Sequence, residues 1–423
     1  MSGSEASGFS TRDGWHYGLM GLPLAFVALP LYVHLPHLYG QTFGLSLSLL
    51  GAILLAVRLF DALVDPWLGR WCDALLRKGT QSLMRICACA CALLALGMWG
   101  LLMPPLWARA QLGLWLACGL LIVYLAFSCL TIAHQSWGAR LGGSGLMRAR
   151  IVSWREGLGL LGVVAASVLP TLVSWPVWAG ILAATLVLAW WQWQKAPRPI
   201  SAPNAADGGS SIWRPWQHSA FRRLISVFVV NGSASAVPAT LVLFFIQDGL
   251  GGKAFEGGFL AIYFVCAAAS LALWLRLVRI RGLVFTWGLG MVLSVLVFAW
   301  VMTLSPGDLL AYAVICALSG AALGADLAIP AALLAVVMAK QGDESGHAGA
   351  YFGWWHVATK FNLALAAGIS LPLLAWLGYT PGNSSAPALQ ALSWVYAALP
   401  CALKSLAALM LWRLARTHAD TLK

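Results

Sequence analysis

Three ionisable residues stand close together in an otherwise apolar stretch of the sequence. Arg58, Asp61 and Asp65 are spaced at i, i+3 and i+7, which places all three on one face of an α-helix. Two carboxylates one helical turn apart can bind a monovalent cation or share a proton, and Arg58 can partly neutralise Asp61. A structural ladder of ion pairs is the alternative interpretation. The spacing therefore predicts a coupling pair, Asp61 and Asp65, with Arg58 as a counter-charge.

The composition shows what kind of protein surrounds these charges. Of the 423 residues, 61% are hydrophobic and 9% are charged, whereas a soluble domain is about half apolar and roughly a quarter charged. The mean hydropathy of +0.81 excludes a soluble globular enzyme. A transmembrane helix takes about 20 to 25 residues, so the chain has room for roughly a dozen. We expect an all-α polytopic protein of the inner cell membrane, embedded in the lipid bilayer.

Apolar runs, separated by glycine, proline and charged residues, give twelve candidate spans. A polar stretch with four prolines separates the sixth span from the seventh and is typical of a linker. We therefore predict an N-terminal six-helix half over 1–194, a linker over 195–218 and a C-terminal six-helix half over 219–423. The spans cover about 14–39, 44–66, 83–104, 110–133, 151–174, 176–194, 220–247, 254–276, 282–304, 308–338, 350–377 and 388–414.

The basic residues predict the orientation. The net charge is +12, and 21 of the 26 Lys and Arg residues fall in the segments that face one side. Only Arg109 and Lys253 fall on the other side. Since positive loops stay in the cytosol, we expect both termini and the linker there. Charge confined to short loops between apolar runs fits a membrane topology better than nucleic-acid binding.

A few polar residues lie inside the later spans. Lys360 lies about ten residues into the eleventh span, too deep to reach the interface easily, so it needs an acidic partner such as Asp61 or Asp65. Asp326 in the tenth span is either a cavity residue or bonded to a neighbouring helix. Trp354, Trp355 and His356, which precede Lys360, are candidates to line the solute pathway, with membrane-belt packing as the alternative for the tryptophans.

A second charged group is predicted at the cytosolic side. Glu156 follows Arg155 at the start of the fifth span, and Asp73 and Arg77 lie after the second span. Ion pairs near a surface are individually weak, and weak contacts suit a gate that must open. We predict that these four residues form a cytosolic gate.

Several motifs resemble one transporter family in register over most of the chain. The pattern Asp61-x-x-x-Asp65-Pro-x-x-Gly69-x-x-x-Asp73 resembles the second-helix signature of the glycoside–pentoside–hexuronide:cation symporters, the melibiose-permease-like branch of the major facilitator superfamily. Further resemblances are RAR at 148–150 with WREG at 154–157, FRRL at 221–224 with NG at 231–232, GADLAIP at 324–330, and YFG at 351–353 with ATK at 358–360.

The resemblance implies a fold and a set of roles. It implies two six-helix halves that alternate access to a site near the bilayer midplane. Asp61 and Asp65 would bind the coupling cation, Lys360 would lie near the solute and cation sites, and Asn231 would line the pathway. Ser128 stands where the family keeps a sugar-binding aspartate. That loss of an acid makes a galactoside doubtful and a proton at least as plausible as sodium.

The leading hypothesis is a secondary active symporter that moves a small polar solute, a sugar or glycoside, with a proton or sodium. It would act as a monomer with no cofactor and no bound metal. Symport of a lysolipid or another amphiphile is the alternative on the same fold. A membrane-embedded enzyme is a remote alternative, since neither HExxH nor GxSxG occurs. A non-transporting sensor is also remote. No GxxxxGK[ST] loop supports ATP-driven transport.

Overall fold

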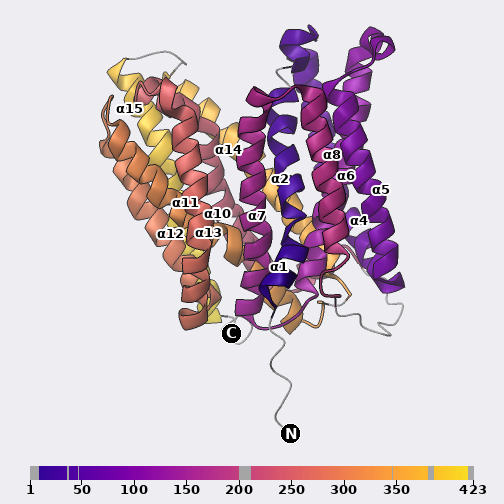
Figure 1. The fold of residues 1–423 in the computed structure, drawn as a ribbon. Helices are drawn as coiled ribbons and strands as arrows, with labels where there is room; N and C mark the ends of the chain where they lie inside the picture. The colour runs from indigo at the N-terminus through magenta and orange to yellow at the C-terminus, as the bar shows by residue number, and fades with distance from the viewer. Residues whose placement is uncertain are drawn as a thin grey trace. The chain divides into compact units, whose positions relative to one another are not determined.

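The computed structural model describes residues 9–35, 38–45, 47–199, 211–344, 346–379 and 385–417. The described residues form helices and no strands. They fall into two compact units, which are described separately. Unit 1 comprises Met1–Pro215 and Met338–Val357, and unit 2 comprises Trp216–Val337 and Ala358–Lys423. Figure 1 colours unit 1 mostly from indigo to magenta and unit 2 mostly from red to yellow.

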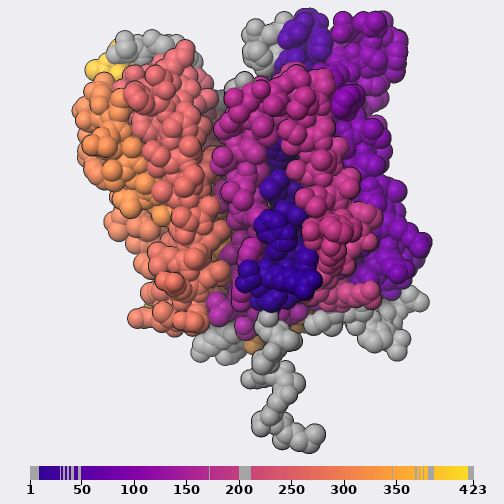
Figure 2. All heavy atoms as spheres, viewed as in Figure 1, coloured from indigo at the N-terminus to yellow at the C-terminus, as the bar shows by residue number. Residues whose placement is uncertain are grey.

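Unit 1 begins with a broken helix. The Ser10 side chain caps α1 by accepting from the Asp13 amide, and a turn at Leu19 and Met20 separates α1 from α2. Figure 2 shows α1 and α2 as an indigo stripe flanked by α7 and α8. The helices of unit 1 are α1 (Thr11–Gly18), α2 (Gly21–Leu29), α4 (Leu47–Lys78), α5 (Thr80–Leu102), α6 (Leu112–Ala139), α7 (Gly145–Leu172) and α8 (Trp175–Trp193), with π-helical turns at Pro30–His34 and Leu38–Thr42.

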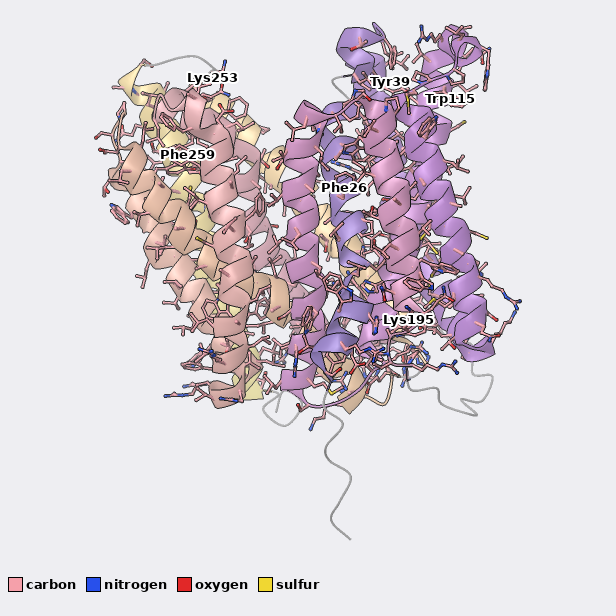
Figure 3. All side chains as sticks on the ribbon, viewed as in Figure 1. Phe26, Tyr39, Trp115, Lys195, Lys253 and Phe259 are labelled. Atoms are coloured by element: carbon pink, nitrogen blue, oxygen red, sulfur yellow. The ribbon has the colours of Figure 1, made fainter. Side chains whose placement is uncertain are left out.

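Close helix packing in unit 1 depends on small residues. A Cβ at Gly21 would fall on the carbonyl oxygen of Arg155, and one at Gly162 on that of Leu22, so α2 and α7 touch backbone to backbone. On the opposite face of α2, Phe26 (Figure 3) stacks on Trp178 of α8 with ring centroids 4.6 Å apart. The broken first span is therefore held between α7 and α8.

Unit 2 contains the later helices. Its apolar core gathers aromatic rings, among them Phe245, Tyr312 and Tyr396, and the Tyr312 and Tyr396 hydroxyls lie 2.8 Å apart. The short α9 (Arg214–Gln217) joins the two units in sequence. The helices that follow are α10 (Ser219–Phe244), α11 (Glu256–Arg281), α12 (Leu283–Ala299), α13 (Leu309–Lys340), α14 (Ala348–Trp376), α15 (Ala386–Ser393) and α16 (Leu399–Thr417), the last two joined by a π-helical turn at Trp394–Ala398.

The structure confirms an all-α fold of twelve membrane-crossing segments. Within the described ranges, nine helices are long and apolar enough to cross a membrane. Helices α4 and α14 and the segment formed by α1 and α2 complete the twelve. The end of α13 and the start of α14 belong to unit 1, although the rest of both helices belongs to unit 2.

The second span is longer than predicted. The hydropathy pattern predicts an end at Pro66, with Asp73 and Arg77 in a loop, but α4 continues through Pro66 to Lys78. Hydropathy detects the apolar part of a helix and not its polar extension. Arg77 and Lys78 in the last turn also interact favourably with the negative end of the helix dipole. Part of the predicted linker, residues 200–210, lies outside the described residues.

Candidate functional site

The two predicted coupling carboxylates lie inside unit 1. Asp61 and Asp65 on α4 are 3% and 0% exposed. The hydroxyl of Ser128 on α6 donates to Asp61 Oδ1 at 2.9 Å. Ser128, which the sequence placed on the solute pathway, is therefore a direct partner of one carboxylate. The contact joins the second and fourth spans.

Arg58 and Tyr124 complete this group. Tyr124 precedes Ser128 by one helical turn, so both side chains lie on the same face of α6. The charges of Arg58 and Asp61 both act on the Tyr124 hydroxyl. Two buried carboxylates beside one guanidinium and two hydroxyls can hold a proton or a small cation. Tyr124 was missed as a site residue, although its i, i+4 spacing from Ser128 could have indicated it.

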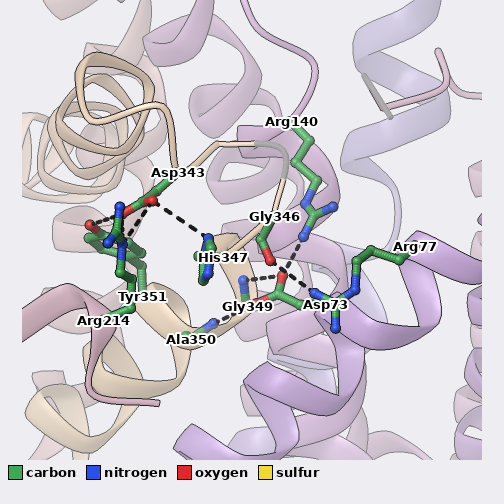
Figure 4. Close-up of polar contacts among 10 residues, drawn as sticks. All are labelled: Asp73, Arg77, Arg140, Arg214, Asp343, Gly346, His347, Gly349, Ala350 and Tyr351. Atoms are coloured by element: carbon green, nitrogen blue, oxygen red, sulfur yellow. Dashed lines mark hydrogen bonds and ion pairs between the residues drawn. The ribbon is translucent and has the colours of Figure 1, made fainter. Parts of the chain in front are cut away.

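Asp73 has backbone partners (Figure 4). Its buried carboxylate pairs with Arg140, which follows α6. It also accepts hydrogen bonds from the amides of Gly349 at 2.8 Å and Ala350 at 3.1 Å. These amides lie in the first turn of α14, where helical N–H groups have no partner within the helix and attract negative charge. Asp73 thus caps α14 from the end of α4.

The same two helices touch through glycine. A Cβ on Gly69 would overlap the carbonyl oxygen of Gly349, and a Cβ on Gly349 would overlap that of Gly69. One turn further along α14, a Cβ on Gly353 would lie 2.7 Å from the carbonyl oxygen of Asp65. The glycine pair lets the backbones approach closely enough for Asp73 to reach the α14 amides.

The connection between α13 and α14 is also held by charged side chains (Figure 4). Asp343 accepts from Arg214 Nε at 3.2 Å and from the Tyr351 hydroxyl at 2.8 Å. Glu344 pairs with Arg148 of α7 at 2.9 Å. We call these contacts, which hold residues 338–357 against α4, α7 and α9, the α13–α14 clamp. Its other members are Asp73 with its bonds to the α14 amides, Arg77, which donates to the carbonyl oxygen of Gly346, and His347, whose Nδ1 lies 3.5 Å from Asp343.

The clamp includes two of the four predicted gate residues, Asp73 and Arg77. Arg155 and Glu156 pair with each other on α7 instead, and the Arg155 charge acts on the buried Tyr17 hydroxyl of α1. The partners Arg214, Asp343 and Glu344 were not singled out in the sequence, because loop charges carry no spacing signal.

The three predicted pathway residues on α14 lie in the part that belongs to unit 1. The Trp354 indole donates to the carbonyl oxygen of Ile212 at 2.8 Å, so this side chain holds the linker end. His356 Nε2 lies 3.2 Å from the amide oxygen of Gln135 on α6. Trp355 is buried, with 6% exposed. Lys360 lies further along α14, in the part that belongs to unit 2.

Unit 2 has its own buried charge pair. Lys404 Nζ on α16 lies 2.6 Å from Asp326 Oδ2 on α13 and donates to Ser235 Oγ at 3.0 Å. Asn231 Nδ2 donates to Asp326 Oδ1 at 3.1 Å, and the Trp287 indole donates to the same oxygen at 2.9 Å. Asn231 and Asp326, both predicted pathway residues, thus meet. Lys404 was missed, although the rule that marked Lys360, a charge inside a span, applied to it equally.

Comparison with known proteins identifies the fold and the class. A family described as MFS/sugar transport protein matches residues 16–417. No curated protein matches the sequence. Among solved structures, a bacterial homologue of the iron transporter ferroportin in an outward-facing state superposes with a TM-score of 0.70 at 15% identity, covering 96% of this chain and 99% of the other.

Two further solved transporters of the major facilitator superfamily are similar in fold. FucP, a major facilitator superfamily transporter in the outward conformation, gives a TM-score of 0.67 at 12% identity and covers 94% of this chain and 99% of its own. The proton:xylose symporter XylE, bound to 6-bromo-6-deoxy-D-glucose, gives 0.63 at 13% identity, with 95% and 94% covered. Within the described part of this chain, no group of three or more His, Cys, Asp or Glu side chains is placed to hold a metal ion.

Proposed function

Because the chain belongs to the MFS/sugar transport protein family, we propose that it is a cation-coupled symporter of a small polar solute. It is a membrane transporter and not an enzyme. The proposal concerns the coupling and the solute. The observation that carries the coupling is the burial of Asp61 and Asp65 one helical turn apart in unit 1, with Ser128 donating to Asp61.

The energetic cost of burying Asp61 and Asp65 favours a functional role for this pair. A charge at the bilayer centre costs at least about 2.5 kcal/mol on insertion scales, so two carboxylates on one helix are retained at a considerable cost. A bound proton or sodium ion offsets that cost. If cation and solute favour the same conformation, each raises the affinity of the other by the same factor. Arg58 and Lys360 are the proposed counter-charges.

The proposed solute is a sugar or glycoside. The family description supports this class, and the similar fold of XylE, a proton:xylose symporter, is consistent with it. The melibiose-permease-like branch remains a resemblance of motifs. We propose that the protein lies in the inner membrane with both termini in the cytosol, because 21 of its 26 basic residues fall on one side of the predicted topology.

The α13–α14 clamp is the proposed gate on that cytosolic side. It ties residues 338–357 to α4, α7 and α9 through Asp73, Glu344 and Asp343. Opening that side requires these contacts to break. Several of these contacts are ion pairs, and water can solvate the two charges once they separate. Opening the gate therefore does not depend on breaking one strong bond.

The first experiment identifies the solute. Purified protein is screened by thermal shift against methyl-β-D-galactoside, D-glucose, D-xylose and lysophosphatidylcholine, with and without sodium, because a ligand that binds the folded state stabilises it. Stabilisation by lysophosphatidylcholine alone would favour the amphiphile alternative. The solute that stabilises the protein is then used in transport assays.

Coupling is tested in reconstituted vesicles with Asp61→Asn and Asp65→Asn. We expect both variants to lose uphill accumulation while keeping part of solute counterflow, because counterflow needs no cation gradient. The control is Asp308→Asn, which should accumulate solute normally. Asp308 is exposed, and its carboxylate accepts a hydrogen bond from the Ser305 amide. Unchanged concentrative uptake in both single variants would refute the assignment of the coupling site.

A further inference from the structure

The charge pair in unit 2 is held by four helices and is nearly closed to solvent. The side chains of Asp326 and Lys404 are each 9% exposed, and Asn231 is 3% exposed. Asp326 comes from α13, Lys404 from α16, Asn231 from α10, and Trp287 from α12. None of these residues belongs to the coupling pair in unit 1 or to the α13–α14 clamp.

Helix α13 holds Asp326 rigidly. A Cβ on Gly324 would overlap the Ser270 hydroxyl of α11, and the Gly290 position on α12 leaves room for the Ala325 methyl. The residues immediately before Asp326 are therefore packed against two neighbouring helices. A carboxylate fixed in this way is pre-organised for recognition and does not have to be ordered when a ligand binds.

Among the residues that the structure describes, the contacts of the group leave hydrogen-bonding capacity on Lys404 and on the Asn231 amide. Asp326 Oδ1 accepts from Asn231 and Trp287, and Oδ2 accepts from Lys404. An ammonium group has three N–H bonds, and Lys404 directs two of them to Asp326 and Ser235. Asn231 Oδ1 is buried and meets no donor among the residues that the structure describes. A buried acceptor without a donor is unfavourable until a ligand or water supplies one.

This arrangement of donors and acceptors favours one type of ligand group. The ammonium and the carboxylate already neutralise each other, so a charged ligand would find no excess counter-charge. A hydroxyl can donate one hydrogen bond and accept others. It can therefore donate to Asn231 Oδ1 while accepting from the third N–H of Lys404.

We propose that Asn231, Asp326 and Lys404 form a binding site for a hydroxyl group of a neutral sugar or polyol. Asn231 and Lys404 contact the hydroxyl, and Asp326 is a positioning residue that orients both of them. This inference rests on the proposed transport of a sugar or glycoside and adds the residues that contact one of its hydroxyl groups. It does not depend on Asp61 or Asp65.

The test measures equilibrium binding without a cation gradient. Purified full-length protein is titrated with methyl-β-D-galactoside, D-glucose, D-xylose and D-mannitol, and with D-glucuronate and D-glucosamine as charged probes. We expect at least one neutral probe to bind and the charged derivatives to bind at least tenfold more weakly. Preferred binding of a charged probe, or no binding of any neutral probe up to the solubility limit, would overturn the proposal.

Two variants separate recognition from folding. Asn231→Ala should weaken binding of the neutral probe at least tenfold. The double variant Asp326→Leu with Lys404→Met removes the ion pair as a neutral unit, so it should fold while losing binding. Ser319→Ala, whose hydroxyl bonds to its own helix α13, is the matched control. Wild-type affinity in the folded double variant would contradict the site.

Deoxy analogues of the bound sugar identify the hydroxyl concerned. One deoxy analogue should bind weakly to wild type, and Asn231→Ala should no longer distinguish it from the parent sugar. If Asn231→Ala still distinguishes every analogue as wild type does, the contact with Asn231 is wrong. Asp61→Asn should keep this binding. Failure of the coupling site would therefore appear as unchanged uphill uptake in that variant, and failure of the hydroxyl site as unchanged binding in the unit 2 variants.

Discussion

The Ser128 hydroxyl on α6 donates a hydrogen bond of 2.9 Å to the Asp61 carboxylate on α4. Both residues are buried, with 0% and 3% exposed. The family resemblance places an aspartate at the position of Ser128, so this chain has a neutral donor where a second negative charge would stand. The proposed coupling group of unit 1 is consequently less negative, and Asp61 within it is oriented by a hydroxyl.

Ser128→Ala should change the cation dependence of uptake without unfolding the protein. The change removes the hydrogen bond that Ser128 donates to the Asp61 carboxylate. Because such a bond favours the carboxylate without a bound proton, its loss should lower the proton concentration for half-maximal uptake by roughly tenfold if a proton is the coupling ion. Sodium and pH titrations of solute uptake in vesicles measure this. Ser167→Ala on α7, whose hydroxyl bonds to its own helix, is the control. Equal cation dependence in Ser128→Ala and wild type would show that this hydrogen bond has no part in coupling.

Gly349→Ala should destabilise the clamp strongly. The added methyl would collide with the carbonyl oxygen of Gly69, which is backbone and cannot rotate away. Overpacking of this kind costs about 1–3 kcal/mol, so the midpoint of thermal unfolding should fall by several degrees. Gly346→Ala is the matched control three residues away, because its Cβ position is open. Equal midpoints for the two variants would contradict the direct contact of α4 with α14.

Asp343→Ala should loosen the clamp more than Arg214→Ala. Asp343 is the shared acceptor of Arg214 and Tyr351, and its side chain is 3% exposed, whereas that of Arg214 is 39% exposed. Pairs with one exposed partner contribute about 0.2–1 kcal/mol, whereas removing the buried carboxylate breaks its contacts with both Arg214 and Tyr351. Hydrogen exchange of the first turn of α14 reports the opening. A larger effect from Arg214→Ala would mean that the linker contact, and not Asp343, organises this connection.

The fold and the shared helix face of Asp61 and Asp65 could be predicted because their signals are local. Each span needs its own run of apolar residues, and Asp61 and Asp65 share a helix face through their spacing alone. The clamp could not be predicted in the same way. The partners of Asp73 are backbone amides 276 and 277 residues away, and an amide leaves no mark in the sequence. Lys404 could have been predicted, since it is charged within an apolar run.

His347 gives the clamp a dependence on pH. It lies outside the helices, and burial lowers its pKa below the usual value. Asp343 and Asp73 raise that pKa in part, and Arg214 and Arg77 lower it further. A histidine with a lowered pKa in the folded state is held neutral. The stability that it contributes is therefore present above its ordinary pKa of about 6.5 and is lost as the pH falls below that value.

Acidification should therefore destabilise wild type more than His347→Gln. Glutamine keeps a polar side chain but cannot take up a proton, so its unfolding midpoint should fall less between about pH 8 and about pH 5.5. Thermal unfolding of both proteins across this range measures the difference, and the other titrating groups contribute equally to both curves. His16→Gln, a change at a partly exposed histidine on α1 that contacts Gln192, is the control and should follow wild type. Parallel curves for wild type and His347→Gln would exclude His347 as the source of the pH dependence.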